Sequence, residues 1–106
     1  MQIFGLKNCD TCRKALKTLE NATFFDVRDE PLPDELLRRA LAEFPDDLLN
    51  TRSTTWRGLS AEEQARPVLE LLKAHPALMK RPLFLREDGK MFLGWTAKTQ
   101  TQITAA

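Results

Sequence analysis

The stretch that decides the fold is residues 2–27, QIFGLKNCDTCRKALKTLENATFFDV. Its first part, Gln2 to Leu6, is apolar enough for a short buried strand, and a polar break follows it. From Cys12 to Leu19 the apolar positions recur at the spacing of one helix face. Residues 23–27 then combine aromatic and β-branched side chains, which is typical of a second strand. We therefore expect a βαβ unit, with parallel strands and a right-handed crossover.

The middle of the chain, approximately residues 30–80, changes to helical patterns. A proline near the first helical position and acidic residues in the first turn predict a helix from about residue 33. Its apolar stripe ends before Pro45. Further helices are expected over 46–50, from a capping box at 60–63, and over 68–74. The segment is therefore predicted to be nearly all helical.

Strand patterns return near the end of the chain. Residues 83–86 and 91–93 read as two antiparallel strands joined by a turn with the Asp88-Gly89 hairpin signal. Residues 96–106 are a weak, mostly polar candidate helix. The predicted fold class is α/β, a thioredoxin/glutaredoxin-like mixed four-stranded sheet. An all-helical insert separates its βαβ and ββα halves.

Length, charge and composition narrow the class of protein. A chain of 106 residues fits a single domain, residues 1–106, and a net charge of +1 gives no reason to expect direct nucleic-acid binding. No apolar stretch is long enough to span a membrane, and the N-terminus lacks the apolar segment of a signal peptide. Two cysteines do not suggest a secreted disulfide scaffold. We therefore expect a cytoplasmic protein.

The two cysteines form a Cys-x-x-Cys motif between the first strand and the first helix, the position of a thioredoxin-like redox motif. A thiol at a helix N-terminus is favoured as thiolate by free backbone N–H groups and the helix dipole. Lys7, Arg13 and Lys14 are expected to add positive charge, partly opposed by Asp10. We expect Cys9, which comes first, to be the nucleophile and Cys12 to be the resolving cysteine.

Two other interpretations of the cysteines remain open. They are unrelated residues, one of them packed in the helix, or they belong to a zinc site. The zinc interpretation is weaker, because two cysteines and the single His75 do not complete a four-ligand site. We expect no metal site, and His75 is interpreted as a surface or helix-end residue.

Four segments of the chain resemble, in order, the conserved blocks of the arsenate reductase (ArsC)-like family, including its Spx and YffB branches. They are Lys7–Ala15, Leu48–Arg57, Lys80–Leu83 and Gly89–Trp95. Together they are spread over residues 7–95, which is most of the chain. The resemblance implies a thioredoxin-like fold with a helical insert, in agreement with the patterns above.

The resemblance also implies roles for individual residues. Cys9 matches the nucleophilic cysteine, and Arg81 matches an arginine before a cis proline, Pro82, that faces it. Arg52 matches a second arginine, which reaches the site from the insert. Guanidinium groups bind oxyanions bidentately and stabilise thiolates, although solvated surface charge is the alternative for both arginines. Substrate contacts are expected from Lys7, Asn8, Thr11, Arg13 and Pro82.

Two departures from the arsenate reductase pattern affect the expected activity. Gly94 stands where those enzymes have a third arginine, as in the YffB and Spx branches. The second cysteine, Cys12, is typical of Spx-like proteins. This chain therefore combines YffB-like blocks with an Spx-like cysteine pair.

The resemblance and the cysteine pair together favour a small thiol oxidoreductase. We expect glutathione as co-substrate, or a glutaredoxin as reductant, with no bound cofactor. The second interpretation is an Spx-like redox regulator whose partner is the C-terminal domain of the RNA polymerase α subunit. Arsenate reduction is the third. We expect a monomer that does not bind membranes.

Overall fold

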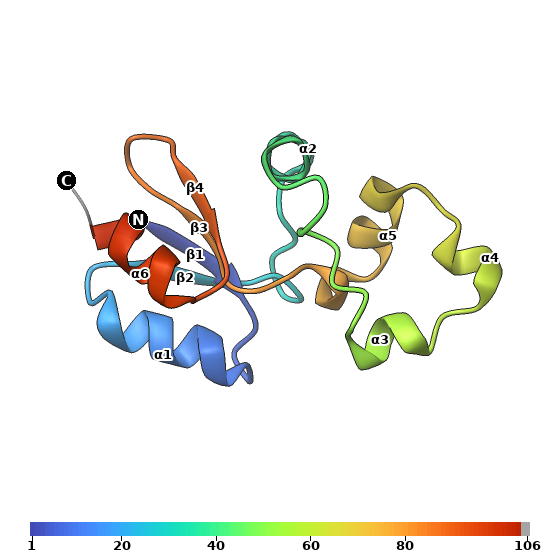
Figure 1. The fold of residues 1–106 in the computed structure, drawn as a ribbon, viewed down its shortest axis with the longest axis horizontal. Helices are drawn as coiled ribbons and strands as arrows, with labels where there is room; N and C mark the ends of the chain where they lie inside the picture. The colour runs from blue at the N-terminus through green and yellow to red at the C-terminus, as the bar shows by residue number, and fades with distance from the viewer. Residues whose placement is uncertain (105–106) are drawn as a thin grey trace. The chain divides into compact units, whose positions relative to one another are not determined.

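The computed structural model describes residues 1–104, in which a four-stranded sheet has the strand order β2-β1-β3-β4 (Figure 1). Strands β1 and β2 are parallel, whereas β3 pairs antiparallel with both β1 and β4. The mixed α/β sheet predicted from the sequence is therefore confirmed. The elements of this part are β1 (Gln2–Gly5), α1 (Asp10–Thr18), β2 (Thr23–Asp26), β3 (Leu83–Leu85), β4 (Met91–Leu93) and α6 (Ala97–Thr104).

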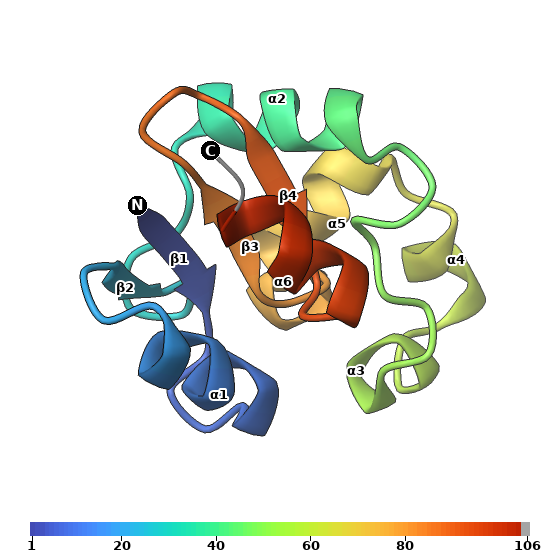
Figure 2. The same cartoon turned by 60° about the vertical axis from the view of Figure 1, so that its left-hand side comes forward.

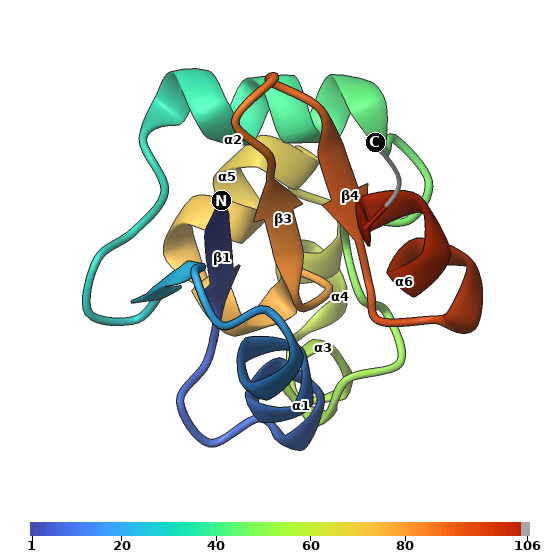
Figure 3. The same ribbon diagram turned by 90° about the vertical axis from the view of Figure 1, so that its left-hand side faces the viewer.

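Helices α1 and α6 pack against the same face of the sheet. Ile3 of β1 and Phe84 of β3 are register partners, and both are fully buried against Ala15 of α1 and Ile103 of α6. Trp95 adds an aromatic contact, with its ring centroid 5.5 Å from that of Phe84. Burying side chains of this size contributes about 1.5–3 kcal/mol each, so this cluster anchors both helices to the sheet. Figure 3 shows the strands β1, β3 and β4 lying side by side, together with α1 and α6.

The β3–β4 hairpin turns at the predicted Asp-Gly pair. Gly89 has a φ of 90°, a conformation that residues with a Cβ rarely adopt, and its N–H donates to the Arg86 carbonyl at 2.9 Å. The Asp88 carboxylate accepts the Lys90 N–H at 3.1 Å and pairs with the Arg86 guanidinium at 2.7 Å. These local contacts explain why a short sequence signal was sufficient to predict the turn.

The chain divides into two compact units, residues 31–80 and the sheet-bearing remainder. Within the 31–80 unit, α2 contacts α5, and an ion pair of 2.6 Å joins Lys73 Nζ to the Asp34 carboxylate (Figure 2). The capping residue Ser60 accepts the Glu63 N–H at 3.2 Å, as the sequence predicts. The helices are α2 (Asp34–Glu43), α3 (Thr54–Arg57), α4 (Ala61–Gln64), α5 (Val68–Ala74) and a 3₁₀ turn, Pro76–Leu78.

The helix predicted over residues 46–50 is wrong. Leu49 instead forms an isolated antiparallel bridge with Met79. The Asn50 N–H donates to the Leu78 carbonyl, and the Lys80 N–H donates to the Leu48 carbonyl, both at 2.7 Å. Because these partners lie about thirty residues away, local periodicity did not reveal them. The unit is accordingly less helical than predicted, with turns between its short helices.

Two remaining sequence predictions concern membrane-spanning segments and the C-terminal helix. None of the helices over residues 1–104 is both long and apolar enough to cross a lipid bilayer. The candidate helix predicted over 96–106 corresponds to α6 (Ala97–Thr104). Its last two predicted residues, 105–106, lie outside the described part of the chain.

Candidate active site

The cysteine loop lies where the parallel strands β1 and β2 end. Gly5 and Asp26 are register partners at these carboxyl ends, and the chain then turns from Leu6 into α1. The Cys9 N–H donates to the Leu6 carbonyl at 3.1 Å, which closes the turn. Cys9 is the N-cap of α1, and its carbonyl accepts the Arg13 N–H at 3.0 Å. The predicted placement of a thiol at a helix N-terminus is therefore confirmed.

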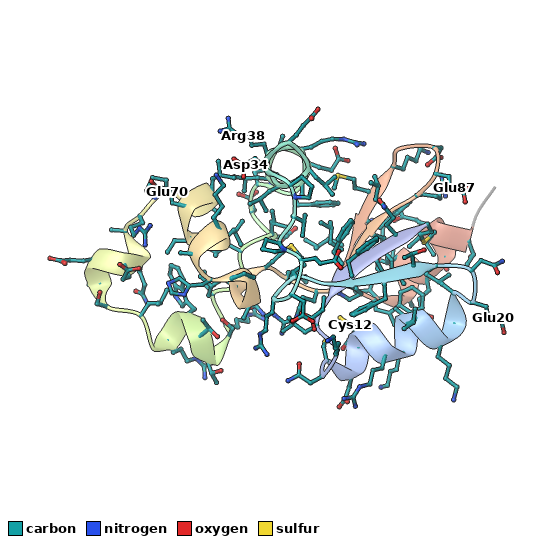
Figure 4. All side chains as sticks on the ribbon, turned by 180° about the vertical axis from the view of Figure 1, so that it is seen from behind. Cys12, Glu20, Asp34, Arg38, Glu70 and Glu87 are labelled. Carbon is teal, nitrogen blue, oxygen red and sulfur yellow. The ribbon has the colours of Figure 1, made fainter. Side chains whose placement is uncertain are left out.

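The two cysteines differ sharply in exposure. Cys9 is half-buried, whereas only 1% of Cys12 is exposed, and both are free thiols. Figure 4 shows Cys12 in the first turn of α1. Burial raises the pKa of the Cys12 thiol to about 12, with a further rise from the neighbouring Cys9 sulfur and an opposing contribution from the Leu6 N–H. Cys12 is therefore a protonated thiol at neutral pH.

Cys9 has the opposite character. Burial is the largest single effect and raises the pKa of the Cys9 thiol, whereas hydrogen bonds from the backbone N–H and the thiol of Cys12 lower it. The Arg81 guanidinium contributes a hydrogen bond and its positive charge, so the pKa of Cys9 lies below its ordinary value. The site thus holds one thiol prepared to ionise beside one that stays protonated, and only the thiolate is a strong nucleophile.

The charges of Lys7 and Arg13 are used differently from the prediction. Lys7 Nζ pairs with the Asp29 carboxylate at 2.6 Å, and Arg13 Nε donates to the Lys7 carbonyl at 2.9 Å. A second, 3.5 Å contact joins Arg13 to Asp10. The cation that lowers the pKa of Cys9 is instead Arg81. Arg13 holds the cysteine loop from its helix side.

Asp26 also holds the cysteine loop, a role that the sequence did not reveal. Its carboxylate accepts the Lys7 N–H and the Arg28 N–H, each at 2.9 Å. Burial alone would raise the pKa of Asp26, but these backbone N–H groups lower it, so the carboxylate stays ionised. The sequence shows only an acidic residue at the end of a predicted strand. Its role in holding the loop follows once β2 is known to pair with β1.

Arg81 and Pro82 begin the second half of the sheet. The Arg81–Pro82 peptide bond is cis, which confirms the prediction made from the family resemblance. The Pro82 carbonyl accepts the Gly94 N–H at 2.8 Å. Gly94 has a φ of 82°, so its backbone conformation favours glycine at the position where arsenate reductases were expected to have an arginine.

The other predicted site residues occupy varied places. Asn8 and Thr11 are exposed on either side of Cys9, and Pro82 is buried. Arg52 belongs to the 31–80 unit, where it is exposed and its backbone N–H donates to Asn50 Oδ1 at 3.1 Å. The substrate contacts of these residues stay predictions. His75 ends α5, as expected, and no group of three potential metal ligands occurs among the residues described.

The comparison with protein families identifies the chain. A family model described as the ArsC family matches residues 4–103. The chain belongs to the ArsC family. A relative in Haemophilus influenzae, an uncharacterized protein, is 39% identical to this ArsC-family chain over 107 residues and spans 91% of both. The global transcriptional regulator Spx of Listeria innocua is 30% identical over 95 residues, which cover 80% of this chain and 72% of Spx.

Solved structures of other proteins share the ArsC-family architecture. A YFFB protein matches with a TM-score of 0.85 at 28% identity, covering 98% of each chain. An arsenate reductase (ArsC) related protein from Brucella melitensis matches with a TM-score of 0.71 at 35% identity, covering 95% of this chain and 91% of that one. The predicted family, with its Spx and YffB branches, and the thioredoxin-like fold are both confirmed.

The contrast between the two thiols predicts selective alkylation. Because ionisation of a thiol precedes its reaction, iodoacetamide at neutral pH should modify Cys9 at least about tenfold faster than Cys12. The Cys9 rate should rise with pH and level off at a lower pH than for a free cysteine, since its pKa is lowered. Peptide mapping after timed quenching measures both rates. Faster labelling of Cys12 would reverse the roles.

Proposed function

We propose that this ArsC-family protein is a thiol oxidoreductase in which Cys9 is the nucleophile and Cys12 the resolving cysteine. The observation that carries the proposal is the asymmetry of the pair. A half-buried thiol with a lowered pKa sits at the N-terminus of α1, in contact with a buried thiol whose pKa is raised to about 12. Thiol–disulfide exchange needs these two roles, one sulfur to attack a substrate and one to release it.

The first step is attack on an external disulfide. The Cys9 thiolate attacks one sulfur of the disulfide RS–SR, forms a mixed disulfide, and expels RS⁻, which takes a proton from water. Arg81 stabilises the attacking thiolate by its charge and its hydrogen bond. The loop that carries Cys9 is fixed by Asp26 and Arg13, so the nucleophile is held in place before substrate arrives.

The second step uses Cys12. In the dithiol form the neighbouring Cys9 sulfur contributes to the raised pKa of Cys12. Once Cys9 is in a mixed disulfide it no longer carries charge, so this contribution is lost and Cys12 gives up its proton to solvent more readily. The Cys12 sulfur then attacks Cys9 Sγ, and the second RS⁻ leaves. Cys9 and Cys12 end as a disulfide, and RS–SR has been reduced to two thiols.

Glutathione is the proposed co-substrate, with a glutaredoxin as the alternative reductant. Its disulfide needs no metal or organic cofactor for exchange, and its carboxylates are the anions that a guanidinium such as that of Arg81 binds. A dithiol pair of this kind operates in a reducing compartment such as the cytoplasm, where glutathione keeps thiols reduced. The protein is proposed to work there as a monomer.

The stoichiometry with oxidised glutathione tests this function. The reduced protein should lose both thiols per chain and release two molecules of reduced glutathione, with no adduct left on the wild-type chain. Thiol titration and intact mass spectrometry follow the reaction. A protein that keeps both thiols, or that binds one glutathione on each cysteine, would contradict the proposed pair of roles.

A second candidate function is redox-dependent regulation of transcription. The observation that favours it is the 30% identity to the regulator Spx, together with the cysteine pair. In this case the partner would be the C-terminal domain of the RNA polymerase α subunit, and disulfide formation would change the affinity. Calorimetric titration of that domain with oxidised and reduced protein decides the question. Equal binding, or none, in both states would exclude it.

Poor arsenate reduction is the third expectation, and Gly94 offers its test. Holding an oxyanion against a thiolate needs fixed positive charge, and a missing charge-assisted contact costs about 1.5–3 kcal/mol. Because Gly94 has a positive φ, any side chain there introduces strain, so Gly94→Arg is compared with the similarly strained Gly94→Gln. Arsenate turnover should rise only in Gly94→Arg, by about tenfold. Efficient turnover by the unmodified protein would contradict the charge argument.

A further inference from the structure

Gly5, the last residue of β1, lies directly against the buried thiol of Cys12. A methyl group at Gly5 would overlap Cys12 Sγ, and it would also lie 3.4 Å from Cys12 Cβ and 3.5 Å from Phe24 Cε1. Gly5 has an ordinary negative φ, so its backbone conformation does not require glycine. We therefore attribute the glycine at position 5 to packing, because only a residue without a side chain leaves room for Cys12 Sγ.

The surroundings leave the sulfur little freedom to move aside. Cys12 is 1% exposed, and its helix is anchored to the sheet by the fully buried Ala15 one turn later. The Leu6 N–H, next in the chain after Gly5, is hydrogen-bonded to the same sulfur. Two consecutive residues, Gly5 at the end of β1 and Leu6 directly after it, thus line the position of the reduced Cys12 sulfur. We call this position the seat of the thiol.

We propose that Gly5 is a positioning residue that seats the reduced Cys12 thiol and thereby favours the dithiol form of the pair over its disulfide. This inference rests on the proposed function, because it assigns Gly5 a part in the same redox pair. The overlap occurs in the structure with two free thiols, so a side chain at Gly5 penalises that form directly. A disulfide holds its two sulfur atoms about 2.05 Å apart, so in this proposal Cys12 Sγ shifts toward Cys9, and away from Gly5, only when the disulfide forms.

The test is a comparison of Gly5→Ala with the wild type in glutathione redox buffers. The equilibrium is the exchange of protein dithiol and oxidised glutathione for protein disulfide and two reduced glutathiones. Gly5→Ala should shift it toward the protein disulfide by about tenfold, since overpacking a buried site strains one form more than the other. A shift below threefold, or a shift toward the dithiol, would overturn the proposal.

Thermal unfolding tests the packing between Gly5 and Cys12 Sγ independently of the redox equilibrium. Gly5→Ala should lower the melting temperature of the reduced protein by at least about 4 °C, and that of the oxidised protein by less. In a Cys12→Ala background the overlapping sulfur is gone, so Gly5→Ala should then have little effect. Equal losses in both backgrounds, or failure of both Gly5→Ala and the double variant to fold, would show that Cys12 Sγ is not what the methyl group meets.

Gly58→Ala provides a matched control. A Cβ at Gly58 would lie 3.5 Å from the Thr54 carbonyl oxygen, an ordinary contact, and Gly58 has a φ of −79°. This variant should leave both the equilibrium and the melting temperatures near those of the wild type. If the wild-type protein formed no Cys9–Cys12 disulfide, the proposed function would fail, while the thermal comparison in the Cys12→Ala background would still decide whether Gly5→Ala clashes with the Cys12 thiol.

Discussion

Replacing Cys9 with serine is expected to abolish exchange with oxidised glutathione, lowering the rate by at least about a thousandfold. A serine hydroxyl does not ionise near neutral pH and does not attack disulfides, and the remaining thiol, Cys12, is buried with a pKa raised to about 12. The release of reduced glutathione, followed by a thiol-specific reagent under quenched conditions, measures the rate.

The matched control for this loss is Cys12→Ser, which keeps the nucleophile. Its first attack should proceed within about tenfold of the wild-type rate, because Arg81 and the backbone N–H at position 12 still favour the Cys9 thiolate. If Cys9→Ser retained substantial exchange while Cys12→Ser lost it, Cys12 would be the attacking sulfur and the assignment would be wrong.

Replacing Arg81 with glutamine is expected to lower the reactivity of Cys9 about tenfold at neutral pH. The guanidinium supplies both a hydrogen bond and a positive charge to the thiolate, and a hydrogen bond to a charged group contributes about 1.5–3 kcal/mol. Its loss raises the pKa of Cys9, so less thiolate is present at a given pH and the rate–pH curve moves to higher pH. Alkylation of Cys9 measured over a range of pH checks both effects.

Two further variants show whether the charge is responsible. Arg81→Lys keeps the charge and should retain more reactivity than Arg81→Gln, although lysine lacks the planar fork of donors. Arg86→Gln removes an arginine that pairs with Asp88 and lies 5.3 Å from the centroid of the Phe92 ring. It should affect stability without moving the Cys9 curve. An unchanged curve in Arg81→Gln would show that this guanidinium does not stabilise the thiolate.

Much of the fold was predictable because its signals are local. The alternation from strand to helix to strand lies within residues 2–27, and the Asp88-Gly89 turn is set by contacts among residues 86–90. The predicted helix at 46–50 failed for the complementary reason. Its backbone pairs with residues 78–80, and no periodicity in the local sequence records such a distant partner.

The same distinction holds in the site. The motif of Cys9 and Cys12 is local and was recognised, and the family resemblance supplied Arg81. The ion pairs of Lys7 and Arg13 with other groups were missed, because every nearby cation had been assumed to act on the thiol. Gly5 and Asp26 were missed because their roles depend on the register of two strands and on where α1 places its first turn.

The most direct test of the central claim is to trap the mixed disulfide. Cys12→Ser is incubated with oxidised glutathione, and the intact mass and the peptide that carries the modification are determined. The proposed roles predict one glutathionyl group per chain, located on Cys9, whereas wild-type protein treated in the same way carries an internal disulfide and no adduct. A Cys12→Ser protein that remains unmodified, or a wild-type chain that accumulates a stable adduct, would contradict the proposed nucleophile and resolving pair.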